Sequence, residues 1–136
     1  MILPITTTCA ALLGLISVPL TIHVSVRRAM IGLKSGKIDA AVFGHADDLM
    51  LRNSIRAFGN FVEYTPLALI LLALLEGQGA PSGLVWGIGG AFVAGRVVHG
   101  LAMTFISHNP APRGLAMLAT YAAFLVPSIW MLTQLS

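Results

Sequence analysis

A stripe of polar residues interrupts an otherwise apolar segment near the middle of the chain. It consists of residues spaced by four, four and three positions: Arg52, Arg56, Asn60 and Glu63. In a helix of about 3.6 residues per turn this spacing places them on one face, and Tyr64 lies beside the last of them. Because arginine and glutamate bind groups of opposite charge, the stripe predicts either a buried ion pair or a site for a charged ligand.

Other basic residues lie within or at the ends of the remaining apolar segments. Arg96 and His99 are three residues apart, so they share one face of a helix. Three more arginines lie where apolar segments end or begin: Arg27, Arg28 and Arg113. Since arginine does not lose its proton, this surplus of positive charge must face water, lipid headgroups or an anionic ligand.

Two structural explanations compete with a ligand site. Glu63 could form a buried ion pair with Arg56 or with Arg96, which would fix the register of two helices. Arginines near a membrane surface also extend to lipid phosphates, which would account for the four nearest the segment ends: Arg27, Arg28, Arg52 and Arg113. Because neither explanation accounts for Arg96 and for the whole stripe, we favour an anionic ligand.

The composition identifies the elements that carry these residues. Hydrophobic residues make up 57% of the 136 and charged residues 10%, whereas a soluble domain carries about 25% charged residues. The apolar residues form four blocks of about 20, the length a helix needs to cross about 30 Å of hydrocarbon. We therefore predict an all-α integral membrane four-helix bundle, one domain over residues 1–136, with spans at about 2–26, 53–75, 84–106 and 114–135.

The positions of the basic residues predict the orientation of this bundle. Six of the eight Lys and Arg residues lie between Arg27 and Arg56, and Arg113 lies in the third loop. The positive-inside rule then places the first and third loops in the cytoplasm and both termini outside. In a bacterium the membrane would be the inner membrane. The stretch from about His45 is expected to be helical and to lead into the second span.

Other function classes find little support in the sequence. The net charge of +3 follows from the membrane orientation, so we do not expect nucleic acid as a partner. Cys9 is the only cysteine, lies in the first apolar block and is expected to pack among apolar side chains. The spacing of potential ligands predicts no metal site, and the chain has neither a P-loop nor a dinucleotide fingerprint.

The third apolar block is rich in glycine. Gly87, Gly89 and Gly90 occur together, and Gly95 follows. Glycines on membrane helices let a neighbouring backbone approach closely. We therefore expect this block to pack tightly against other helices.

The segment RAFGNFVEYTPLALILLALLE (residues 56–76) resembles the second-helix motif of the MAPEG family, the membrane-associated proteins of eicosanoid and glutathione metabolism. That motif is roughly Arg-Ala-x-x-Asn-x-x-Glu-Tyr-x-Pro, and its matches here are Arg56, Ala57, Asn60, Glu63, Tyr64 and Pro66. The spacing is similar to that of the microsomal glutathione transferase branch and of many bacterial members. Two shorter segments resemble further motifs of the family: Arg27-Arg28-Ala29 and Gly95-Arg96-Val97-Val98-His99.

The resemblance implies a homotrimer that binds glutathione between adjacent subunits near the cytoplasmic face. It implies that glutathione is held by Arg56, Asn60, Glu63 and Tyr64, with contributions from Arg27, Arg96 and His99. It also implies that an arginine stabilises the thiolate, and Arg28 and Arg113 are both candidates. The charges agree, since glutathione carries two carboxylates and one ammonium and therefore suits several arginines and a single acid.

The expected function is that of a membrane-bound glutathione-dependent transferase or peroxidase. Its partners would be membrane lipid and a lipophilic small-molecule substrate, either an electrophile or a lipid hydroperoxide. The alternative is a non-catalytic protein of the same fold that binds lipid or glutathione. A small transporter that uses the arginines as an anion path is a third hypothesis, disfavoured because the chain shows neither internal repeats nor paired broken helices.

Overall fold

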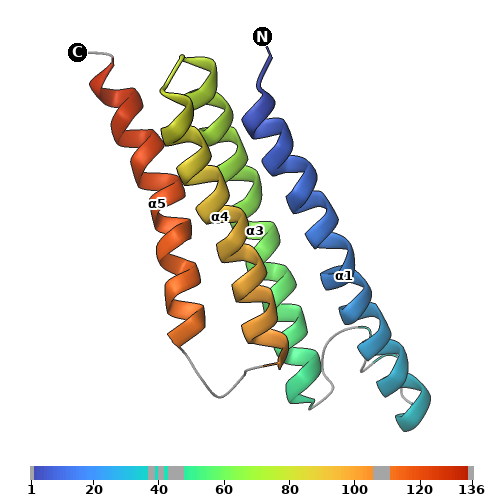
Figure 1. Cartoon of the computed structure of the whole chain (residues 1–136). Coiled ribbons are helices and arrows are strands. Elements are labelled where there is room, and N and C mark those ends of the chain that lie inside the picture. Colours follow the sequence, from blue (N-terminus) through green and yellow to red (C-terminus); the bar gives the residue numbers. More distant parts are fainter. Residues whose placement is uncertain (1, 37–38, 40–41, 43–47, 106–110, 135–136) are drawn as a thin grey trace.

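Four long helices pack side by side in the computed structural model (Figure 1). The structure describes residues 2–36, 39, 42, 48–105 and 111–134. The helices are α1 (Pro4–Ser35), α3 (Leu49–Gly77), α4 (Ser82–Phe105) and α5 (Ala111–Thr133). Each of the four is long and apolar enough to cross a membrane. The prediction of an all-α bundle of four apolar helices is confirmed.

The first helix continues well beyond its apolar block. The predicted span ends near residue 26, where Arg27 and Arg28 interrupt the apolar sequence, but α1 runs on to Ser35. Arginine is a good helix former, so a fall in hydropathy does not stop a helix. The helix ends at Gly36, whose φ of 64° is a left-handed conformation that glycine adopts without steric cost.

The second helix also begins earlier than its apolar block. The side chain of Asp48 accepts a hydrogen bond from the backbone N–H of Leu51 at 2.7 Å, which caps the start of α3. The helix therefore includes the turn before residue 53, where the span was predicted to begin. Three predicted boundaries fall outside the described residues: His45, Ile106 and Leu135.

The helices α3 and α4 form the centre of the bundle. Helix α1 packs against both of them on one side and α5 packs against both on the other (Figure 1). Successive helices run in opposite directions, so the start of α1, the α3–α4 turn and the end of α5 lie at one end. The opposite end gathers the arginines that are far apart in sequence: Arg27, Arg28, Arg52, Arg56 and Arg113.

Three glycines let α4 approach its neighbours closely. A Cβ on Gly89 would lie 2.7 Å from Cys9 Sγ of α1, and a Cβ on Gly100 would lie 3.3 Å from Leu20 of the same helix. A Cβ on Gly95 would lie 3.0 Å from the Cβ of Ala119 on α5. The expected close packing therefore occurs on two sides of α4, and Cys9 is buried in the core, 2% exposed. Gly87 and Gly90 face open space.

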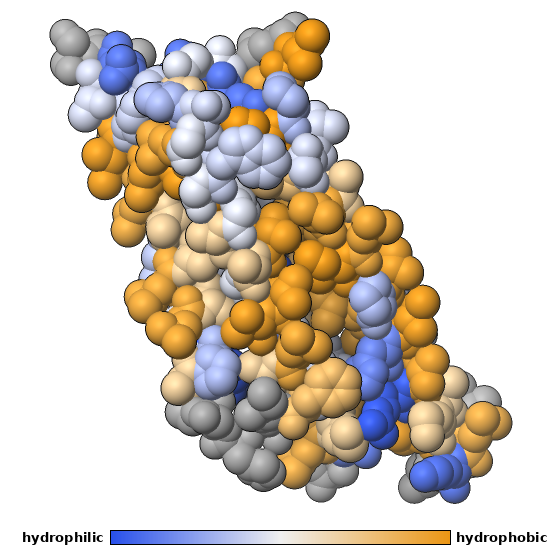
Figure 2. Space-filling model, viewed as in Figure 1, coloured by the Kyte–Doolittle hydropathy of each residue, from blue (hydrophilic) through white to orange (hydrophobic). Residues whose placement is uncertain are grey.

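Apolar side chains cover most of the middle of the molecule. Figure 2 shows a broad hydrophobic band across this face, with hydrophilic residues gathered toward the ends. Large aliphatic side chains are exposed on it or on other faces, among them Leu15, Leu118 and Ile129. A soluble protein rarely exposes a continuous apolar surface of this size, so the surface is one that lies in lipid.

A carboxylate from α3 caps the first turn of α1. The Glu76 carboxylate accepts hydrogen bonds from the backbone N–H groups of Ile5 at 2.9 Å and Thr6 at 2.7 Å. The first N–H groups of a helix have no partner within it, and the positive end of the helix dipole favours a negative charge there. Glu76 thus joins the end of α3 to the start of α1. The sequence marked it only as the end of a span.

We predict that Glu76→Gln lowers the melting temperature of the purified protein by several degrees. The variant loses the charge that interacts with the helix dipole and one of the two acceptor oxygens. The measurement is thermal unfolding in detergent, with Glu63→Gln as the matched control on the same helix. Equal melting temperatures for the two variants would show that the contact adds no stability.

Candidate functional site

An open pocket of about 500 Å³ gathers five of the nine predicted site residues. It lies in the half of the bundle where the arginines are found, between α3, α4 and the start of α5. Helix α3 contributes Arg56, Asn60 and Glu63, while α4 contributes His99 and α5 contributes Arg113. The remaining lining residues are Ile55, Gly59 and Met103. We call it the arginine pocket.

The periodicity of α3 explains how these side chains share one pocket. The residues that α3 buries follow one side of the helix, including Ala57 and Phe61. The polar residues lie on a different side, where Arg56 and Glu63 are exposed and Asn60 is half-buried. Because helical positions three and four apart are neighbours, the sequence spacing alone brings these groups together.

Neither ion pair considered from the sequence forms within the part of the chain that the structure describes. Arg56 and Glu63 make no ion pair or hydrogen bond there, although both line the arginine pocket. The hydrogen-bond partners of Arg96 are neutral groups. An ion pair among the described residues that fixes helix register therefore does not account for the charges of Arg56 and Glu63.

Arg96 lies behind the pocket and does not line it. Its side chain is 1% exposed. One terminal nitrogen, Nη1, donates to Asn60 Oδ1 at 2.8 Å, and the other, Nη2, donates to the hydroxyl of Thr120 on α5. The rings of Tyr64 and Phe92 lie 5.8 and 5.2 Å from the guanidinium carbon, close enough for cation–π attraction. Arg96 therefore contacts Asn60, which lines the arginine pocket, without lining that pocket itself.

Thr120 is a site residue that the sequence did not reveal. It is completely buried, and its hydroxyl donates to the Ala116 carbonyl oxygen at 3.2 Å while accepting from Arg96. A threonine within an apolar block is common in membrane helices, so its type carries no functional signal. Only the packing of α5 against α4 shows that it completes the shell around Arg96.

The remaining predicted residues lie outside the arginine pocket. Tyr64 is half-buried, with its ring 5.9 Å from that of Phe124 on α5. Arg28 lines a separate cavity of about 160 Å³ between α1 and α3, which also includes Ser25 and Phe58. Arg27 is half-buried on α1. Of the two candidates for the thiolate arginine, Arg113 shares a pocket with Glu63 in one subunit and Arg28 does not.

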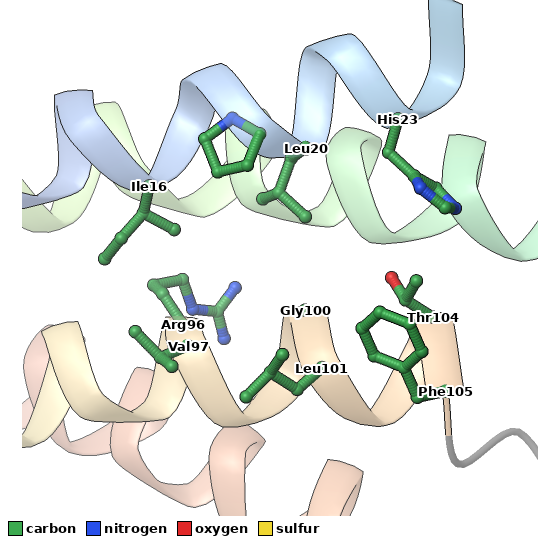
Figure 3. Close-up of a pocket in the computed structure, with 10 residues that line it drawn as sticks. Ile16, Leu20, His23, Arg96, Val97, Gly100, Leu101, Thr104 and Phe105 are labelled. Carbon is green, nitrogen blue, oxygen red and sulfur yellow. The ribbon is translucent and has the colours of Figure 1, made fainter. Parts of the chain in front are cut away.

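A further cavity lies between α1 and α4. It measures about 280 Å³ and is lined mainly by apolar side chains, including Ile16, Leu20 and Leu101. Figure 3 shows His23 and Thr104 near one end of it, and the side chain of Arg96 near the other. Arg96 thus lines this cavity and donates to Asn60, which lines the arginine pocket.

The arginine pocket is rich in hydrogen-bond donors. Arg56 and Arg113 supply two guanidinium groups, and Glu63 is the one carboxylate among its lining residues. Such a set suits a flexible ligand with more than one anionic group and a single cation. Among the described residues, no group of three or more His, Cys, Asp or Glu side chains is placed to hold a metal ion.

We predict that Arg56→Gln and Glu63→Gln leave the stability of the ligand-free protein within about 0.5 kcal/mol of the wild type. Among the described residues, neither side chain has a partner whose loss would leave a buried charge. Breaking a buried ion pair would instead cost about 3–5 kcal/mol. Melting temperatures in detergent without added thiol distinguish the two cases, and a large fall for either variant would restore the ion-pair explanation.

Comparison with known proteins identifies the family of the chain. Residues 6–133 match the model of the MAPEG family. The inner membrane protein YecN of Escherichia coli strain K12 is 41% identical over 49 residues, which are 36% of this chain and 37% of that protein. YecN of Escherichia coli O6:H1 matches equally, so the similarity spans just over a third of these relatives. No solved structure matches the chain. The family match covers nearly the whole sequence, and the chain belongs to the MAPEG family.

Proposed function

We propose that this membrane protein is a glutathione-dependent transferase or peroxidase that acts on lipophilic electrophiles or lipid hydroperoxides. The observation that carries the proposal is the arginine pocket, whose lining has two guanidinium groups and one carboxylate, in a member of a glutathione and eicosanoid family. A volume of about 500 Å³ is within the range of small-molecule sites.

The charges of glutathione fit the lining of this pocket. A carboxylate of glutathione would pair with Arg56, and its ammonium would pair with Glu63. Asn60 and His99 offer further polar contacts. The one acidic residue of the lining thus meets the one cationic group of the ligand. Arg113 is the second cation of the described lining, and we propose that it faces the thiolate.

The chemistry requires the thiol of glutathione to lose its proton. A free thiol has a pKa of about 8.5, and a nearby cation lowers it by stabilising the thiolate. In a transfer reaction the thiolate forms a bond to an electrophilic carbon and the leaving group departs with its electrons. In the peroxidase reaction two glutathione molecules give one disulfide, while the hydroperoxide becomes an alcohol and water. We propose Arg113 for this role, because it lines the same pocket as Glu63.

A second copy of the chain would cover the exposed side of the pocket. Arg56 and Glu63 are exposed in a single subunit although they lie on a helix long and apolar enough to span a membrane. A charged group that faces lipid near the bilayer centre costs at least about 2.5–3.5 kcal/mol. We propose a homotrimer in which a neighbour covers this face and brings Arg27 and Arg28 toward it.

The orientation of the site follows from its arginines. By the positive-inside rule, the arginine-rich end of the bundle would face the cytoplasm. The ligand would then enter the arginine pocket from that side. The matching Escherichia coli protein is named an inner membrane protein, which supports the cytoplasmic membrane as the location. A lipophilic substrate would enter sideways from the bilayer.

Purified protein should conjugate glutathione to 1-chloro-2,4-dinitrobenzene or reduce cumene hydroperoxide with glutathione. We predict that Arg56→Ala and Glu63→Ala each lower kcat/KM at least about tenfold, because each removes a charged contact to the ligand. Arg52→Ala is the matched control, since Arg52 lies one turn earlier on α3 and is not part of the pocket lining. Full activity in both pocket variants would refute the site. Calorimetric binding of glutathione without turnover would instead indicate a non-catalytic binding protein.

The pH dependence of the reaction separates the two candidate thiolate arginines. Removing the cation beside the thiolate raises the thiol pKa, so the rate falls at low pH and recovers as pH rises past the new pKa. We predict that Arg113→Gln moves the rising limb of kcat/KM to higher pH and that Arg28→Gln does not. The reverse result would assign the role to Arg28 of a neighbouring copy.

A further inference from the structure

A series of hydrogen bonds leads from the arginine pocket through the core to α5. Asn60 of α3 accepts from Arg96 of α4 at 2.8 Å through its side-chain oxygen, and at 3.4 Å through its backbone oxygen. The other end of the same guanidinium donates to Thr120, which donates in turn to Ala116 at 3.2 Å. Three helices thus contribute to one connected set of polar groups.

The chemistry of arginine fixes which way the Asn60 amide is turned. A guanidinium has only donors, so the side-chain atom of Asn60 that it bonds must be the oxygen. The NH₂ group of Asn60 is therefore turned away from Arg96. It makes no hydrogen bond within the described part of the chain, and Asn60 lines the arginine pocket. The pocket thus receives a donor from Asn60.

Thr120 restricts the position of Arg96 by accepting a hydrogen bond from it. Its hydroxyl hydrogen is directed to the Ala116 carbonyl oxygen, so a lone pair of the hydroxyl faces the guanidinium. Both terminal nitrogens of Arg96 are then held by acceptors on different helices. Arg96 cannot rotate toward the pocket without losing a bond in an apolar environment, where an unpaired polar group is costly.

We infer that Thr120 and Arg96 are positioning residues that hold the Asn60 amide as a hydrogen-bond donor to the ligand. The NH₂ group of Asn60 then favours a ligand atom that accepts a hydrogen bond, such as the oxygen of a carboxylate or of a peptide carbonyl. A ligand group that can only donate is disfavoured there. This inference rests on the proposed function, because it names the contact that glutathione or a similar peptide thiol makes there. Thr120 touches no ligand and acts through Asn60.

A double-mutant cycle tests whether Thr120 acts through Asn60. Glutathione affinity is measured by calorimetry for the wild type, Thr120→Val, Asn60→Ala and the double variant. We expect Thr120→Val to weaken binding about fivefold in the wild type, the effect of losing one hydrogen bond. In the Asn60→Ala background the same change should alter affinity less than about twofold. Equal losses in both backgrounds, or no loss in either, would overturn the inference.

Two control variants separate positioning from general destabilisation. Thr120→Ser keeps the hydroxyl and should restore the affinity of the wild type. Thr65→Val removes another buried threonine hydroxyl, one that has no hydrogen-bond partner in the structure, and should leave affinity unchanged. If Thr65→Val weakens binding as much as Thr120→Val does, the effect comes from packing and the inference fails.

A measurement without ligand keeps this test distinct from that of the proposed function. Protein labelled with ¹⁵N-asparagine shows side-chain NH₂ signals, and the pair from Asn60 is identified by its loss in Asn60→Ala. We expect Thr120→Val to shift this pair and Thr120→Ser to leave it in place. An unchanged pair in Thr120→Val overturns the inference even if glutathione binds. A shifted pair with no glutathione binding to the wild type refutes only the proposed function.

Discussion

The guanidinium of Arg96 is a full positive charge held inside an apolar bundle by groups that carry no compensating charge. It does not lose its proton, so the protein must solvate it. Asn60 supplies an amide oxygen from α3 and Thr120 a hydroxyl from α5, while the rings of Tyr64 and Phe92 lie against the cation. Dipoles and ring quadrupoles act only at short range. The relative positions of α3, α4 and α5 are therefore constrained by one side chain, and the pocket that Asn60 lines depends on the same contacts.

The arginine pocket forms because α3 carries apolar residues on one side and polar residues on another. Ala57 and Phe61 face inward and are buried, whereas Arg56 and Glu63 are exposed on the pocket side. No ionic contact within the described residues uses these two charges. The same helix thus packs into the core on one side and lines the arginine pocket on the other. Because the charged residues lie on the other side, the buried side of α3 can pack against its neighbours as an apolar surface.

Much of this arrangement could be predicted from the sequence, because hydropathy and helical periodicity are local properties. The four helices and the shared pocket of Arg56, Asn60 and Glu63 are of this kind. The direction of a long side chain is not local: Arg96 and His99 are three residues apart, yet only His99 lines the pocket. The role of Thr120 depends on which residue of α4 it meets. The end of α1 was also missed, since hydropathy marks where a chain leaves hydrocarbon and not where its hydrogen bonding stops.

The contact between Glu76 and the start of α1 has a consequence for how the bundle is assembled. The N–H groups of Ile5 and Thr6 belong to the first helix to be synthesised, but their acceptor lies at the far end of the next one. Until α3 has crossed the bilayer, these groups have only water or lipid headgroups as partners. The contact can form only when the second helix has returned to the side where the first began, so it joins α1 and α3 as a hairpin at that end of the bundle.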